Sequence, residues 1–411
     1  MEAGFTDPTG AEPIPLTEPA DGVPPVVTSA RALREAAEAL AAASGPVAVD
    51  TERASGYRYS QRAYLVQLRR EGAGTVLVDP IALGGRVEPL VKALEGTEWV
   101  LHAASQDLPC LAELGLRPAT LFDTELAGRL AGYERVALGA LVERLLGYRL
   151  EKGYGAADWS RRPLPVEWLT YAALDVELLL PLRRVLEEEL AAQGKLDWAL
   201  QEFEAVRTSP PPQPRPEPWR RTSGIHRLRS ARQLAAVREL WLARDELARR
   251  RNLAPGRVLP DSAIVQAVLA DPQGIPDLLK LPVYGGRVQR RQAGVWMAAL
   301  ERARRLPRNE LPNPTPPQDG PPPTNRWAER DPAAAARLAA ARAELAKLAE
   351  RHRLPVENLL QPDLVRRLCW EPPADTDPAG VGAALRAGGA RPWQVELTAE
   401  VLSAALRAEA E

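Results

Sequence analysis

The sequence predicts an α/β domain followed by two all-helical domains. Two proline-rich stretches, 209–218 and 311–323, divide the 411 residues, and such stretches favour extended spacing over packing. Only the first part combines short apolar runs with helical periodicity. The predicted organisation is a disordered leader at 1–25, domains at 26–208, 222–308 and 326–408, and linkers at 209–221 and 309–325.

Within the first domain, the predicted strands are short runs of apolar or β-branched residues bounded by Gly, Pro or charged residues. The helices follow from apolar spacing of three and four. Ser105 and Asp123 are placed to cap the helices that follow them. The predicted strands are 46–51, 64–70, 75–79 and 98–103, and the predicted helices are 29–43, 105–114, 123–131, 137–146 and 165–192.

The two helical domains resemble each other. Residues 248–261 recur loosely as 349–363, about 100 residues later. Each copy has a basic helix end, a proline-containing turn, two apolar residues and then Pro-Asp at the start of a new helix. The pattern indicates duplicated helical modules, each ending in a tryptophan-containing helix, around Trp296 and Trp393.

The formal net charge of −1 conceals an uneven distribution. Residues 1–210 carry −10, residues 211–310 carry +11, and residues 311–411 carry −2. The basic excess of the middle part is almost entirely arginine, which suits contact with a phosphate backbone. The alternative is a solvated, arginine-rich surface without a polyanionic partner.

Composition also excludes several classes. No stretch approaches the roughly 20 apolar residues of a membrane span, and the first 25 residues lack the basic start and apolar run of a secretory signal, so a cytoplasmic protein is expected. Cys110 and Cys369 lie in apolar helical patterns and are expected to be reduced and buried. His102, His226 and His352 are too scattered to form a zinc site.

Asp50 and Glu52 end an apolar strand. Side chains two residues apart on a strand point to the same side, so both carboxylates can face one site. The Asp-x-Glu pattern alone is weak, because it recurs at Asp123 and at Asp175. Asp123 is better explained as a helix cap.

Tyr171 and Asp175 lie four residues apart in a strong helical pattern, on one face of the helix. A second Tyr-x-x-x-Asp, Tyr154 to Asp158, is interrupted by glycines and is not expected to be helical. Asp107 has two interpretations: an acid in a first helical turn, favoured by the helix dipole, or a ligand brought to the same site by the preceding strand.

Four converging acids without basic partners repel one another, by about 4 kcal/mol per pair at 4 Å and an effective dielectric of 20. They therefore require cations between them, and two divalent metal ions would fill the site. Candidate nucleic-acid contacts surround it. Gln67 and His102 also fit hydrogen-bonded core or rim positions, whereas the loop after Glu52 offers rings for base stacking and a cation for phosphate. These candidates are Thr51, Tyr57, Arg58, Tyr59, Gln61, Gln67 and His102.

These motifs resemble those of bacterial ribonuclease D, in the tyrosine branch of the DEDD exonuclease superfamily. Residues 49–52, 102–107 and 171–176 are similar to its three motifs in order, and 157–164 to the stretch before the third. The second motif departs from many relatives, which carry Asn where this chain has Ser105-Gln106. Residues 222–308 resemble an HRDC (helicase and ribonuclease D C-terminal) domain, and 326–408 a degenerate second copy.

The resemblance implies a ribonuclease-H-like exonuclease fold and two Mg²⁺ or Mn²⁺ ions held by Asp50, Glu52, Asp107 and Asp175, with Tyr171 orienting the attacking water. It implies 3′–5′ hydrolysis of RNA to nucleoside 5′-monophosphates by a monomer, with tRNA precursors as substrates and the HRDC modules holding the RNA. Two alternatives remain open: a DNA-directed 3′–5′ exonuclease, and an inactive nucleic-acid-binding protein.

Overall fold

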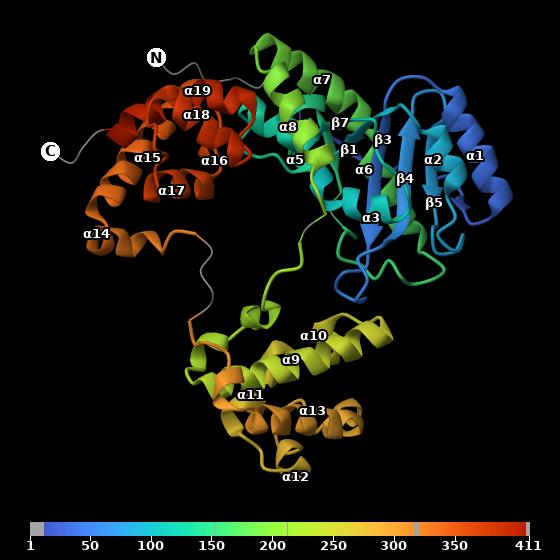
Figure 1. Ribbon diagram of the computed structural model, residues 1–411. Coiled ribbons are helices and arrows are strands. Elements are labelled where there is room, and N and C mark those ends of the chain that lie inside the picture. The colour runs from blue at the N-terminus through green and yellow to red at the C-terminus, as the bar shows by residue number, and fades with distance from the viewer. Residues whose placement is uncertain (1–11, 152, 212, 316–319, 408–411) are drawn as a thin grey trace.

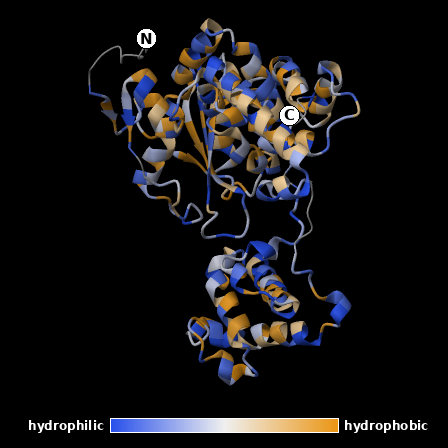
Figure 2. Cartoon of the chain, turned by 90° about the vertical axis from the view of Figure 1, so that its left-hand side faces the viewer, coloured by the Kyte–Doolittle hydropathy of each residue, from blue (hydrophilic) through white to orange (hydrophobic). Residues whose placement is uncertain are grey.

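The computed structural model describes residues 12–407, except 152, 212 and 316–319. Figure 1 shows an upper body, made of the α/β domain and the C-terminal helices, and a separate helical body below it. Figure 2, turned by 90°, shows the same separation, with hydrophobic residues along the strands of the upper body. No helix in the described part of the chain is long and apolar enough to cross a membrane.

A six-stranded mixed sheet forms the centre of the first domain, in the order β2-β5-β4-β3-β6-β7. The central strand β3 pairs antiparallel with β4 and parallel with β6. The four strands predicted from the sequence are confirmed, and β2 and β7 were missed. The bounds are β2 Val26–Val27, β3 Val47–Arg53, β4 Ala63–Arg70, β5 Gly74–Val78, β6 Glu98–Leu101 and β7 Thr120–Asp123.

The helices of this domain pack on the sheet. The predicted helix 165–192 is two helices, α6 and α7, because Leu178 leaves the helical conformation (φ −106°, ψ 5°). Helices α2 and α8 were missed. The bounds are α1 Ala30–Ala42, α2 Glu88–Ala93, α3 Leu108–Glu113, α4 Thr124–Ala131, α5 Leu138–Leu146, α6 Val166–Glu177, α7 Leu179–Ala192 and α8 Leu196–Thr208, with a 3₁₀ turn η1 at Ala104–Gln106.

The predicted caps had different outcomes. Asp123 caps α4 as expected, accepting hydrogen bonds from the amides of Glu125 and Leu126. Ser105 does not cap α3: it lies inside η1, and Asp107 occupies the cap position without a side-chain hydrogen bond to the helix. The sequence pattern could not reveal that a separate 3₁₀ turn precedes α3.

The prediction of a disordered leader was wrong for its described part. Strand β1, Ile14–Leu16, pairs parallel with β8, Tyr148–Leu150, and the Ile14 amide donates to the Gly147 carbonyl at 2.8 Å. Residues 1–11 lie outside the described residues. The pairing partner comes from more than 130 residues later, so local composition did not indicate it.

The middle module, residues 218–310, has its own hydrophobic core. Its first long helix, α9, starts with a capping box between Ser230 and Gln233. Trp219, within the predicted linker, is buried in this core. The bounds are η2 Pro218–Arg221, η3 Ile225–Arg227, α9 Ala231–Arg251, α10 Pro255–Val258, α11 Asp261–Ala270, α12 Ile275–Leu278, α13 Arg287–Arg305 and η4 Arg308–Glu310.

The C-terminal module, residues 324–407, repeats the opening helix order of the middle module. In each, a 21-residue helix is followed by a four-residue helix and a helix of nine or ten residues. The bounds are η5 Thr324–Arg326, α14 Trp327–Arg330, α15 Pro332–His352, α16 Val356–Leu359, α17 Pro362–Trp370, α18 Pro378–Ala387 and α19 Pro392–Arg407.

The C-terminal module and the first domain share one hydrophobic core. The indole rings of Trp198 and Trp393 stack with centroids 5.0 Å apart. The buried Glu202 carboxylate pairs with the Arg391 guanidinium and accepts a hydrogen bond from Trp393 Nε1 at 2.9 Å. The first and third domains therefore form one packed unit in this structure.

Candidate active site

Three carboxylates meet beside the C-terminal half of β3, which continues past the predicted end at residue 51 to Arg53. Asp50 and Glu52 point to the same side of this strand, and Asp175 comes from α6, which crosses β3, β4 and β5. One carboxylate oxygen of each residue lies within 4.8 Å of those of the other two. Asp50 and Asp175 are half-buried, whereas Glu52 is buried.

The electrostatics of this group disfavour three negative charges. Burial raises the pKa of the Asp50 carboxyl well above its usual range, and the charges of Asp107 and Asp175 add to the effect. Burial, followed by the charge of Asp50, raises the pKa of Glu52 to about 10. Burial also raises the pKa of Asp175 to about 7. This all-oxygen donor set fits a hard divalent cation, which would replace the protons that these pKa values retain.

Asp107 lies close by but outside this group of three. Its Oδ1 accepts a hydrogen bond from the Thr51 hydroxyl at 2.7 Å and lies 3.6 Å from Arg53 Nη2. Burial raises its pKa to about 6, against the lowering effects of Thr51 and Arg53. Its charge nevertheless acts on Asp50. The structure thus holds the fourth predicted acid beside the site through two residues of β3.

Tyr171 lies one helical turn before Asp175 on α6 and hydrogen bonds to it. Burial and then the charge of Asp175 raise the pKa of the Tyr171 phenol well above its usual range. Its ring meets Tyr154 edge-on, with centroids 6.0 Å apart. An ideal Cβ on Gly155 would lie 3.4 Å from the Tyr171 hydroxyl, an ordinary contact distance, so the 153–155 segment packs against the phenol. The non-helical decoy motif at Tyr154 therefore packs on the candidate catalytic tyrosine.

Two of the predicted nucleic-acid contacts, Thr51 and His102, have partners within the domain, and a third, Gln67, is buried. The buried Thr51 hydroxyl contacts Asp107, as described, and lies 3.3 Å from Cys110 Sγ. His102 Nδ1 lies 3.0 Å from the Thr124 hydroxyl, and burial lowers its pKa to about 4, so it is neutral at physiological pH. Gln67 is 0% exposed and faces Asp50 across the β3–β4 ladder. Neither of its amide atoms has a hydrogen-bond partner among the described residues.

The loop after Glu52 was expected to be an open platform for bases, and the structure places both of its tyrosine rings against the middle module instead. The Tyr57 ring lies under the Arg257 guanidinium at 4.0 Å, and the Tyr59 hydroxyl donates to Asp245 Oδ1 at 3.0 Å. The Ser60 amide donates to Asn252 Oδ1 at 3.0 Å. These partners lie almost 200 residues away in the sequence, so the loop alone did not indicate them.

The other two candidates of this loop, Arg58 and Gln61, have partners within the first domain. Arg58 Nε donates to the Ser160 hydroxyl at 2.7 Å. The exposed Gln61 side chain accepts a hydrogen bond from Ser55 at 2.7 Å. Of the four loop candidates, only Gln61 remains exposed at the surface.

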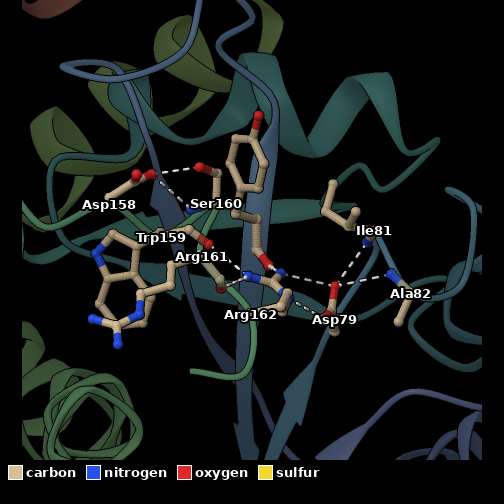
Figure 3. A network of polar contacts seen from close by, with 9 residues as sticks. Asp79, Ile81, Ala82, Asp158, Trp159, Ser160, Arg161 and Arg162 are labelled. Carbon is tan, nitrogen blue, oxygen red and sulfur yellow. Dashed lines mark hydrogen bonds and ion pairs between the residues drawn. The ribbon is translucent and has the colours of Figure 1, made fainter. Parts of the chain in front are cut away.

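An ion pair that the sequence reading missed holds the segment before α6. Figure 3 shows Arg162 reaching Asp79, at the end of β5, through Nε at 2.6 Å and Nη2 at 3.0 Å. Arg162 also donates to the carbonyls of Tyr64 and Trp159, and Asp79 accepts from the amides of Ile81 and Ala82. The network fixes the chain that leads into the helix bearing Tyr171 and Asp175. The sequence signal for this network was the similarity of residues 157–164 to the family's stretch before the third motif.

Comparisons with known proteins agree with this geometry. Three family models match the chain: "3'-5' exonuclease" over residues 24–191, "HRDC domain" over 233–300, and "3' to 5' exonuclease C-terminal domain" over 320–406. The C-terminal module, expected to be a second HRDC copy, is thus matched by a model of its own.

Similar proteins cover most of the chain. Ribonuclease D of Gluconacetobacter diazotrophicus is 32% identical, over 80% of this chain and 82% of the relative, and that of Nitrobacter hamburgensis is 30% identical, over 86% and 88%. A solved protein from Bifidobacterium adolescentis superimposes with a TM-score of 0.89 at 38% identity, over 96% of this chain and all of that one. Escherichia coli RNase D, described as an exoribonuclease involved in structured RNA processing, superimposes with a TM-score of 0.67 at 28% identity, over 93% and 98%.

Proposed function

Because the chain belongs to the ribonuclease D family and is a metal-dependent 3′–5′ exoribonuclease, we propose that Asp50, Glu52, Asp107 and Asp175 hold two divalent ions, Mg²⁺ or Mn²⁺. The cluster of Asp50, Glu52 and Asp175 is the main support for this proposal, because one carboxylate oxygen of each residue lies within 4.8 Å of those of the other two. Asp107 is included because its charge already acts on Asp50.

When bound, such ions supply an acidified water for in-line attack and stabilise charge on the leaving oxygen. Asp50, whose carboxyl is affected by the charges of both Asp107 and Asp175, would be one of the residues that hold the ions. Tyr171 holds its proton, because burial and the neighbouring carboxylates raise its pKa. Its phenol can therefore donate a hydrogen bond and orient the attacking water, but it is poorly suited to remove a proton.

The Tyr171→Phe variant tests this role. We expect turnover to fall by roughly 10- to 100-fold, because one positioning hydrogen bond is lost, while the affinity for Mn²⁺ measured by calorimetry stays within about twofold. Loss of metal binding in the variant would contradict the positioning role. An unchanged turnover would show that the hydroxyl is not used.

Metal removal should make stability depend on pH. In the metal-free protein, the pKa values of Asp107, Asp175 and Glu52 are raised to about 6, about 7 and about 10. The folded state then binds more protons than the unfolded state, so its stability falls as the pH rises from about 4, the usual pKa of a carboxyl, to about 10, the pKa of Glu52 in the folded protein. Mg²⁺ at about 100 times its Kd adds about 2.7 kcal/mol.

Thermal unfolding at pH 5, 7 and 8, with EDTA or Mg²⁺, provides the measurement. The melting temperature in EDTA should fall with pH, and the gain on adding Mg²⁺ should grow. A gain of the same size at all three pH values would contradict the assignment of this group as the metal site.

The substrate is proposed to be RNA with a single-stranded 3′ end, such as a tRNA precursor, degraded by a monomer in the cytoplasm. The basic middle module, with its net charge of +11 over 211–310, supports a role in holding the RNA body. Digestion of matched RNA and DNA strands with Mg²⁺, Mn²⁺ or EDTA tests the activity. We expect release of nucleoside 5′-monophosphates from RNA, dependent on metal; cleavage in EDTA or faster digestion of DNA would contradict the proposal.

A further inference from the structure

A groove of about 1560 Å³ opens from the active site. Its lining includes Tyr171 and Asp175 of the active site, most of α5, Gly132 after α4, and Arg353 of the C-terminal module. Pockets for small molecules usually hold about 300–1,000 Å³. The groove is therefore larger than one nucleotide requires and suits an extended chain that enters the site by its end.

The walls of the groove come from three distant parts of the sequence: the N-terminal segment, the region around α5, and the C-terminal module. Pro13 and Pro15 line the groove from the N-terminal segment, which is held by the β1–β8 pairing. On the opposite side, the C-terminal module approaches at Gly132, whose φ is +93°. An ideal Cβ at Gly132 would lie 2.8 Å from the Arg353 carbonyl oxygen, so a residue without a side chain is needed at this junction.

The lining chemistry matches single-stranded nucleic acid. Arg135 and Arg144 are exposed in the groove, and neither makes a hydrogen bond or ion pair to another described residue. The half-buried Tyr133 also lines the groove, with its hydroxyl fixed by Glu189, and its ring can stack on a base. An apolar surface is added by Leu138, Leu145, Leu146 and Leu150.

The groove is not uniformly positive. Arg149 pairs with Glu143 at 3.5 Å, and the acidic Glu134 and Glu151 also line the wall. General attraction of a polyanion is therefore weak here. Binding would depend on individual contacts of the Arg135 and Arg144 guanidinium groups with phosphates, and on base contacts with the tyrosine and leucine side chains.

We infer that the single-stranded 3′ segment of the RNA lies in this groove, with Arg135 and Arg144 contacting phosphates behind the scissile bond. The C-terminal module and the N-terminal segment then serve as its walls. This inference rests on the proposed function, because the groove leads to the carboxylates that are proposed to hold the metals.

The test compares the full-length protein with its double variant Arg135→Ala, Arg144→Ala on a 12-nucleotide RNA and on a dinucleotide without a 5′-phosphate, which has no phosphate behind the scissile one. The ratio of kcat/KM for the long substrate to that for the short one should fall about tenfold. Two lost phosphate contacts should also reduce the slope of log K for RNA binding against log salt by about 1.4, at 0.7 per contact with a single strand. The matched control is Arg34→Ala, an exposed arginine on α1, which should keep the wild-type ratio and slope.

Equal loss of activity on both RNAs, or an unchanged ratio and slope, would overturn the inference. Failure of the proposed function looks different: the wild-type protein would then cleave neither RNA. In that case, fluorescence anisotropy in EDTA still decides the matter, since weaker and less salt-dependent binding of the 12-nucleotide RNA by the double variant would support the groove.

Discussion

The Asp50→Asn variant is expected to lose at least about 1,000-fold in kcat, since it removes a charged ligand from the centre of the acidic group and with it the electrostatic stabilisation of the reaction. Asparagine preserves the size of the side chain, so β3 should keep its pairing with β4 and β6. Mn²⁺ binding, measured by calorimetry, should weaken together with the activity. In EDTA, the variant should be at least as stable as the wild type, because one half-buried carboxyl next to other acids is gone.

The matched control for this experiment is Glu125→Gln. Glu125 belongs to the decoy Asp-x-Glu at Asp123, and its carboxylate pairs with Arg129 on the surface of α4. Activity and metal affinity should stay within about twofold of wild type. If the Asp50 variant kept its activity and its Mn²⁺ affinity, the proposed metal site would be wrong.

The Trp393→Ala variant is expected to destabilise the first domain, although the substitution lies in the C-terminal module. Removing a buried tryptophan costs about 3–5 kcal/mol, and here it also removes the stack on Trp198 and the hydrogen bond to Glu202. Glu202 would then remain buried with Arg391 as its one partner among the described residues. Because one core is shared, the loss should lower the temperature at which dinucleotide cleavage is inactivated.

Trp296→Ala provides the comparison. Trp296 is equally buried but lies in the separate core of the middle module. Its replacement should lower the unfolding temperature of that module, followed by calorimetry, and shift thermal inactivation on the dinucleotide much less than Trp393→Ala does. Equal shifts for the two variants would contradict the division of the molecule into one shared unit and one separate module.

Local sequence patterns were sufficient to predict the parts of the site that lie on a single strand or a single helix. Alternation along a strand placed Asp50 and Glu52 on one side, and a spacing of four placed Tyr171 and Asp175 on one helix face. Burial of the two cysteines was also predictable from the apolar spacing around them and is confirmed. In each case, the residues that matter lie within one turn or one short strand, where backbone geometry dictates direction.

The sequence patterns did not predict contacts between distant segments. Asp107 turns toward Thr51 and Arg53 because a 3₁₀ turn sets the start of α3. Tyr57 and Tyr59 contact the middle module because the fold brings Arg257 and Asp245 of that module next to their rings.

By itself, the sequence determined the α/β-then-helical architecture, the acidic pair, the tyrosine helix and the family. Only the tertiary structure decided that the first and third domains share a core, that the N-terminal segment forms a strand, and that the C-terminal module completes a groove at Gly132. The physical reason is how far apart the interacting residues lie along the chain. Periodicity and capping report the neighbours of a residue along the chain, whereas a core, a groove or a docked loop depends on side chains that meet only when segments one hundred to two hundred residues apart pack together.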